Sequence, residues 1–135
     1  MITKLLSIQV PKFWEIIKFA ATKAEEVDNE DLPAYLNWFL HLLLSDKAQC
    51  WVRLDEDRTI IALLMTQITI DKITAKKSLH LRCIYSFRHV PFDLWREDFD
   101  LLIQFKKQEK CDNITCASKH KKIWEINDYL GCKEK

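Results

Sequence analysis

Hydrophobic periodicity is clearest near the start of the chain, where apolar residues recur every three or four positions, as on one face of a helix. These residues are Phe13, Ile17, Ala20, Ala24 and Val27. Pro11 suits a first helical turn, and the polar run 28–31 precedes a second apolar stripe that predicts a helix from 32 to 45. The first third of the chain therefore predicts two helices packed on another layer.

From residue 49 the hydrophobic period shortens to two, which is typical of strands. Residues 51–54 and 59–65 flank the acidic turn 55–57 and predict a β-hairpin, whose second strand continues to residue 70. The next strand follows a polar connection. In it, Leu79, Leu81, Cys83, Tyr85 and Phe87 alternate with His80, Arg82, Ile84 and Ser86. We therefore expect one apolar face and one mixed face on this strand.

Residues 92–110 return to helical spacing, with acids early and lysines late, an order that complements the helix macrodipole. A short strand is predicted at 113–118 and a last helix at 121–130, ending at Gly131, the only glycine and a natural C-terminal cap. With 135 residues, 48% of them hydrophobic, the chain 1–135 is expected to form a single α/β domain.

Charge and cysteine content narrow the classes of partner. Twenty-one basic against 20 acidic residues give a net charge of +1, so we expect neither nucleic acid nor a membrane as partner, and a protein partner or a second copy stays open. No apolar run reaches the length of a membrane span, and the N-terminus lacks a secretory signal. Five irregularly spaced cysteines predict free thiols in the cytoplasm, without a metal site.

The predicted element order resembles that of the GNAT superfamily of N-acyltransferases over most of the chain. Two short runs add to the resemblance, 106–111 at the end of the long helix and 129–132 at the end of the last one. The resemblance implies a mixed, largely antiparallel sheet flanked by helices. It also implies acetyl-CoA as cofactor, held along the middle strand and its exit. The positions concerned are Tyr85, Phe87, Arg88, His89 and Val90.

The loop that binds the cofactor's diphosphate in this superfamily departs from the family pattern here. An Arg-Gly-x-Gly-x-Gly-type loop is expected, but residues 90–95 contain no glycine. Pro91 removes one amide donor, and Asp93 places a carboxylate where a phosphate would sit and satisfies the helix end itself. Arg88 and His89 lie just before this loop and compensate in part.

The catalytic positions depart as well. The family's usual general acid is a tyrosine four residues before the terminal glycine, and Asn127 occupies that position. Tyr129 is the nearest candidate, about 200° away around the helix. His80 is the candidate base, and Arg82 shares its face; the alternative is that both face solvent or pair with acids of the hairpin turn. Because the sequence ends at Lys135, we expect an incomplete C-terminal hairpin, with substrate-side structure missing or supplied by a second subunit.

Two functions follow from these residues. The first is a structural or interaction module that kept the fold and lost the cofactor, of the kind expected for a phage-encoded, virion-associated protein. The alternative is an active N-acetyltransferase that transfers an acetyl group from acetyl-CoA to an amine. They differ in whether amides near Val90 grip a diphosphate, and in whether the sheet opens beside residues 84–88.

Overall fold

The computed structural model describes residues 2–24, 28–116 and 133–134. Their strands form a sheet in the order β1-β2-β3-β4-β5-β6. The first four strands are antiparallel, whereas β5 runs parallel to β4 and β6 parallel to β5. The strands are β1 (Ile2–Lys4), β2 (Ala48–Leu54), β3 (Ile60–Ile70), β4 (Lys77–Ser86), β5 (Asn113–Cys116) and β6 (Lys133–Glu134). This mixed, largely antiparallel sheet confirms the predicted fold class.

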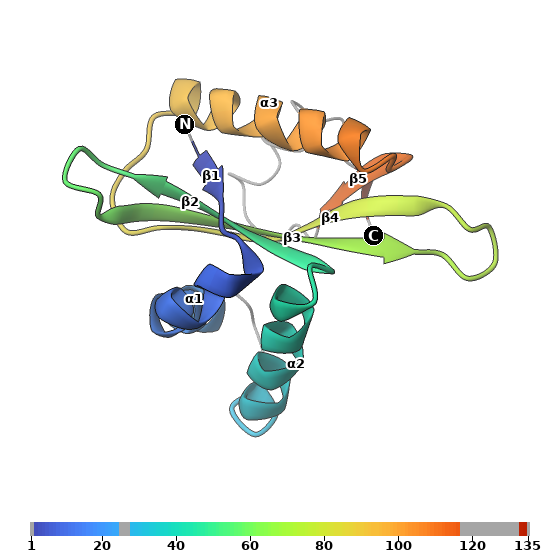
Figure 1. Cartoon of the computed structure of the whole chain (residues 1–135), viewed down its shortest axis with the longest axis horizontal. Helices are drawn as coiled ribbons and strands as arrows, with labels where there is room; N and C mark the ends of the chain where they lie inside the picture. Colours follow the sequence, from blue (N-terminus) through green and yellow to red (C-terminus); the bar gives the residue numbers. More distant parts are fainter. Residues whose placement is uncertain (1, 25–27, 117–132, 135) are drawn as a thin grey trace.

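Helices cover the two faces of the sheet (Figure 1). The helices α1 (Val10–Ala24) and α2 (Leu32–Leu44) lie on one face, and α3 (Phe92–Gln108) lies on the other. The predicted boundaries of all three helices are confirmed to within a few residues. Asp93 in the first turn of α3 and Lys106 and Lys107 in its last turn give the expected charge order. A short β1 and a 3₁₀ turn (Ser7–Gln9) precede α1, and both were missed by the sequence analysis.

Each face of the sheet has its own hydrophobic core. Under α1 and α2, Ile17, Phe39 and Leu43 pack against β2, β3 and the outer half of β4. Under α3, Phe99 and Leu102 pack against the inner half of β4 and β5. Both cores are made of residues that alternate along the strands, so strand register decides which side chain reaches which helix layer.

The alternation along β4 is interrupted by a β-bulge at Arg82. Met65 pairs with Cys83 and Thr66 pairs with Leu81, which leaves Arg82 as an extra residue in β4. Leu79 and Leu81 therefore pack under α3, while Cys83 and Tyr85 pack under α1 and α2. The prediction that these four residues point the same way is wrong. A bulge depends on pairing with the neighbouring strand, which the local pattern does not reveal.

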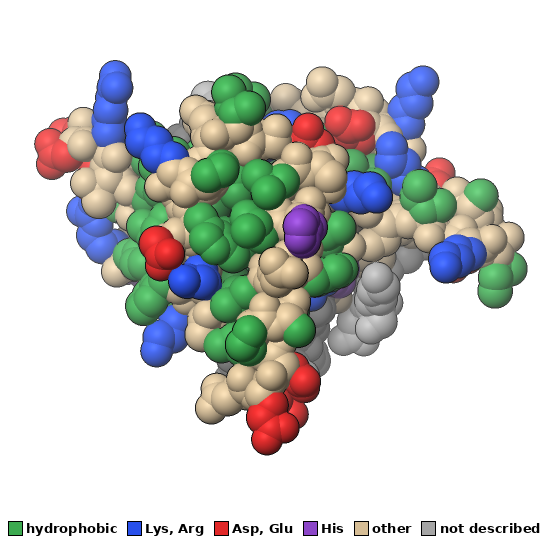
Figure 2. All heavy atoms as spheres, turned by 60° about the horizontal axis from the view of Figure 1, so that its bottom comes forward, with side chains coloured by type: hydrophobic (Ala, Val, Ile, Leu, Met, Phe, Trp, Pro, Cys, Tyr) green, Lys and Arg blue, Asp and Glu red, His purple; other side chains and the backbone are tan. Residues whose placement is uncertain are grey.

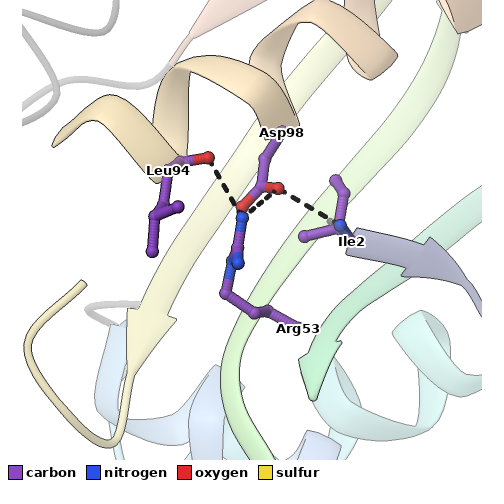
Figure 3. A network of polar contacts seen from close by, with 4 residues as sticks. All are labelled: Ile2, Arg53, Leu94 and Asp98. Atoms are coloured by element: carbon purple, nitrogen blue, oxygen red, sulfur yellow. Dashed lines mark hydrogen bonds and ion pairs between the residues drawn. The ribbon is translucent and has the colours of Figure 1, made fainter. Parts of the chain in front are cut away.

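A buried ion pair joins α3 to the sheet (Figure 3). Arg53 Nε donates to Asp98 Oδ2 at 3.0 Å and Arg53 Nη2 to Asp98 Oδ1 at 2.7 Å. Arg53 Nη2 also donates to the carbonyl of Leu94 in the first turn of α3, and the amide of Ile2 donates to Asp98. Burial raises the pKa of Asp98, and the Arg53 guanidinium opposes that rise. Three segments distant in sequence thus meet at one carboxylate.

The cysteines differ from expectation at one position. Cys50, Cys83 and Cys111 are buried free thiols, and burial raises the pKa of Cys50 to about 12. Cys116 is disulfide-bonded, so the prediction that all the cysteines are free thiols is wrong. The predicted last helix, Gly131 and Tyr129 also lie outside the described residues. None of the helices that the structure describes is long and apolar enough to cross a membrane.

Candidate functional site

The candidate site lies along β4, which pairs with β3 on one side and with β5 on the other. The described β4–β5 ladder runs from Ser78 opposite Asn113 to Leu81 opposite Cys116, the last described residue of β5. We call the end of this described ladder the β4–β5 junction. The bulge at Arg82 lies next to the junction, and residues 83–86 of β4 continue in pairing with β3.

His80 lies on β4, opposite Thr115 in the β4–β5 ladder. It sits between Leu79 and Leu81, which face α3, so its side chain projects from the opposite face. Its Nδ1 lies 2.8 Å from Thr115 Oγ1 on β5, and the residue is buried. The alternative that His80 faces solvent is therefore wrong. A hydrogen bond from the neighbouring strand holds the imidazole in one orientation, as an acid–base residue requires.

Arg82 shares the face of His80, as predicted. Its Nη1 donates to Gln67 Oε1 on β3 at 3.0 Å. The guanidinium also lies over two rings of α2, 5.7 Å from the centre of Tyr35 and 5.2 Å from that of Trp38. The Arg82 side chain thus lies against the aromatic rings of α2, and not against the acids of the hairpin turn.

Two of the predicted cofactor-binding residues are packed against α1 instead. Phe19 of α1 meets Tyr85 edge-on, with ring centres 6.0 Å apart, and stacks on Phe87 at 6.1 Å. Tyr85 and Phe87 also touch each other at 5.0 Å. This aromatic cluster joins the outer half of β4 to the helix layer, so both side chains are engaged within the protein.

The connection from β4 to α3 holds the other three predicted cofactor-binding residues. Arg88 forms an ion pair with Asp55 in the β2–β3 turn, His89 is exposed, and Val90 is buried. Pro91 is the N-cap of α3, and its side chain forms no capping hydrogen bond. The structure gives Asp93 no capping hydrogen bond within the described residues, so the prediction that it satisfies the helix end is wrong.

Asp55 is itself part of a tight turn. Its Oδ1 accepts hydrogen bonds from the amides of Asp57 and Thr59, at 2.9 and 2.8 Å. The amide of Thr59 and the Arg88 guanidinium lower the pKa of Asp55. Arg88, the predicted compensating cation, is thus held by a carboxylate that the turn keeps ionised at neutral pH. Because both side chains are partly exposed, the pair adds little to stability.

Comparison with solved structures identifies the architecture. A protein described as a "probable acetyltransferase" superposes with a TM-score of 0.72 at 9% identity, over 100% of this chain and 91% of its own. An aminoglycoside N-acetyltransferase in complex with CoA gives 0.69 at 11% identity, over 99% and 88%. The aminoglycoside 6'-N-acetyltransferase of Acinetobacter haemolyticus gives 0.67 at 15% identity, over 99% and 91%.

This chain has the GNAT fold. No family model matches the sequence, and no curated protein matches it. Identities of 9–15% establish the fold and leave the activity to be argued from the residues.

Sequence reasoning singled out His80 and the glycine-free loop at 90–95 but did not predict two contacts of the residues around them. The Thr115 hydroxyl that orients His80 comes from a strand about 35 residues away. Asp55, the partner of Arg88, was predicted only as part of a turn. Each contact joins elements that only the assembled sheet brings together. The sequence offered one signal for the second contact. An acidic turn precedes β3 and an arginine follows β4, and these two strands are neighbours.

Proposed function

We propose that this chain is a non-catalytic module that kept the GNAT fold and does not bind acetyl-CoA. The observation that carries the proposal is the connection between β4 and α3. Binding a diphosphate at a helix N-terminus requires several unobstructed amides and room for close approach of the backbone. At this connection the N-cap is a proline without an N–H group, and the first turn carries the carboxylate of Asp93.

The side chains around this helix end support the same conclusion. Val90 is buried, with 6% of its surface exposed, so its side chain is part of the packing. Arg88 is engaged by Asp55, and a diphosphate would have to displace that carboxylate to gain the cation. His89 is the exposed residue of this connection. The proline thus removes one amide donor, and the pairing of Arg88 with Asp55 engages the positive charge that a CoA diphosphate would need.

A module of this kind acts through contacts with another protein or with a second copy. The α1–α2 side of the molecule carries hydrophobic side chains between charged ones (Figure 2). Phe19, Trp38 and Leu44 are each more than 40% exposed there. Apolar groups exposed together on a surface favour association over solvent contact. This surface supports an interaction role for the module.

The second candidate is an active N-acetyltransferase. It is favoured by His80, a buried imidazole that Thr115 orients across the β4–β5 ladder. In that reaction, the base takes a proton from the amine as the nitrogen attacks the thioester carbonyl, and the CoA thiolate leaves. His80 fits the base, whereas the residues of the β4–α3 connection do not fit the cofactor's diphosphate.

Calorimetric titration with CoA separates the two functions. We expect no saturable heat with millimolar CoA, and no acetyl transfer from acetyl-CoA to a panel of primary amines. The matched comparator is the double variant Pro91→Gly, Asp93→Gly, which restores one amide and removes the carboxylate, and in which we expect measurable CoA binding. Tight binding by the unaltered chain, with turnover that His80→Ala abolishes, would establish the transferase instead.

A further inference from the structure

A cavity of about 440 Å³ lies at the end of the molecule away from the β4–α3 connection. Its polar lining residues are Lys4, Ser7, Asp46, Gln49 and Glu109. Its apolar lining residues are Leu6, Ile8 and Phe105. They come from β1, the segment 6–8 with the start of the 3₁₀ turn, the α2–β2 turn, β2 and the C-terminal end of α3. This volume lies within the range of small-molecule sites, and the lining mixes an apolar surface with a few polar groups, as such sites do.

The charged groups of this cavity are of opposite sign, yet they do not pair with each other. Among the described residues, neither Lys4, Asp46 nor Glu109 forms an ion pair, and Lys4 Nζ lies over the ring of Phe105, 5.4 Å from the ring centre. Opposite charges around one cavity attract each other and are usually found paired where their reach allows it. Separate placement leaves each charge available to a ligand that carries both signs.

The wall between these charges is fixed by buried hydrogen bonds. Trp51 Nε1 donates to Thr66 Oγ1 at 3.0 Å, and Thr66 donates to Gln49 Oε1 at 2.8 Å. Gln49 Nε2 in turn donates to the carbonyl of Asp46 at 3.1 Å. The chain of bonds holds the Gln49 side chain and the turn at Asp46 in one arrangement. Such a site pays little ordering entropy when a ligand binds.

The end of α3 adds to the polarity of the cavity. Glu109 is the C-cap of α3; its carbonyl accepts a hydrogen bond from Lys77 Nζ at 2.7 Å, whereas its carboxylate forms no ion pair within the described residues and favours a cationic group. Lys4, which comes from β1, favours an anionic group in the same lining. Phe105, Leu6 and Ile8 provide the apolar surface for a hydrocarbon part. The three features together describe one class of ligand.

We propose that this cavity binds a small zwitterion with an apolar side chain, of the size of an α-amino acid. The ligand's carboxylate meets the Lys4 ammonium, its ammonium group meets Glu109 and Asp46, and its side chain covers Phe105. The site lies beyond the C-terminal end of α3, whereas the β4–α3 connection precedes the N-terminal end of this 17-residue helix, about 25 Å away. The proposal therefore stands or falls independently of CoA binding.

The test is an amide NMR titration of the full chain with L-leucine and two analogues that carry one charge each. Isoamylamine keeps the ammonium group, and 4-methylpentanoate keeps the carboxylate. We expect saturable millimolar binding of leucine, with shifts at Leu6, Ile8 and Gln49. Each analogue is expected to bind about tenfold more weakly, because each lacks one charge-assisted contact.

Two variants assign the charges to residues. Lys4→Met is expected to weaken leucine binding about tenfold and to leave isoamylamine binding unchanged; Glu109→Gln should weaken leucine and leave 4-methylpentanoate unchanged. Lys72→Met and Glu56→Gln, at exposed turn positions that do not line the cavity, are the matched controls. The proposal is overturned if leucine gives no saturable shifts, if either analogue binds as tightly as leucine, or if the controls weaken binding equally.

Discussion

The two ends of the outer half of β4 differ in the side chains that they present. Next to the β4–β5 junction, the bulge at Arg82 and the His80–Thr115 hydrogen bond form an ordered, polar position. At the exit toward α3, Arg88 pairs with Asp55, Val90 is buried, and Pro91 is the N-cap of the helix.

This contrast follows from how each end is built. The β4–β5 junction is made by strand register and by the change from antiparallel to parallel pairing, which the hydrophobic pattern of the whole sheet maintains. A connection such as that between β4 and α3 contributes few residues to the core, and its sequence can change without loss of the fold. The fold is therefore recognisable in solved structures at 9–15% identity, whereas our proposal rests on the residues of this connection.

The largest effect is expected at the ion pair that anchors the first turns of α3. Arg53→Met leaves the Asp98 carboxylate buried without its partner, and we expect it to lower the free energy of unfolding by about 3–5 kcal/mol. Urea unfolding followed by circular dichroism measures this loss. If α3 were held in place by a bound cofactor instead, the loss would be small in the free protein.

The double variant Arg53→Met, Asp98→Leu is the control for that prediction. It removes both charges and fills the site with apolar groups, so it should recover most of the lost stability. A double variant as unstable as Arg53→Met would show that the hydrogen bonds to Leu94 and Ile2 dominate over the pairing of charges.

A smaller loss of stability is expected from the aromatic cluster at the outer half of β4. Phe19→Ala removes the ring that packs on Tyr85 and Phe87, and because Phe19 is 47% exposed, we expect about 1–2 kcal/mol, below the cost for a fully buried ring. Thermal unfolding and the ring proton shifts of Tyr85 report the change. Unaltered Tyr85 shifts would mean that α1 does not hold this part of β4.

On β5, Thr115→Val removes the hydroxyl that orients His80. We expect a loss of about 1 kcal/mol in stability and a changed His80 titration curve by NMR, while Thr115→Ser should keep both near those of the original chain. An identical His80 titration in the valine variant would contradict the role given to Thr115.

The smallest effect is expected at the turn that holds Arg88. The folded-state pKa of Asp55 lies below its ordinary value of 3.8, so its contribution to stability is complete above that pH and is lost as the pH falls through the folded pKa. Asp55→Asn should therefore narrow the difference in stability between neutral and acid pH. Carboxyl NMR titration of Asp55 checks the direction, and Glu56→Gln, in the same turn, is the control.

Sequence reasoning predicted the layers well because they depend on local periodicity. The stripe through Ile17 and Ala20 and the charge order of α3 were sufficient to place two of the helices. The glycine-free loop at 90–95 was also visible without a structure. Local periodicity therefore predicted the helix layers, and the loss of the phosphate loop stays a prediction from composition.

What the sequence did not predict depends on contacts between distant segments. The bulge at Arg82 is invisible in a pattern that alternates without interruption, because it arises from the pairing with β3. The sequence pattern did not distinguish Arg53 from other strand residues, because its partner Asp98 comes from the distant helix α3. The β1 strand is too short for a periodic pattern to appear.

The central claim is that the β4–α3 connection cannot hold a diphosphate, and an amide NMR titration with CoA tests it at that position. The account predicts that the amides of Arg88, His89, Val90 and Asp93 keep their chemical shifts up to millimolar CoA, and that the Arg88–Asp55 pair stays intact. Saturable shifts confined to these amides, with release of Arg88 from Asp55, would contradict it.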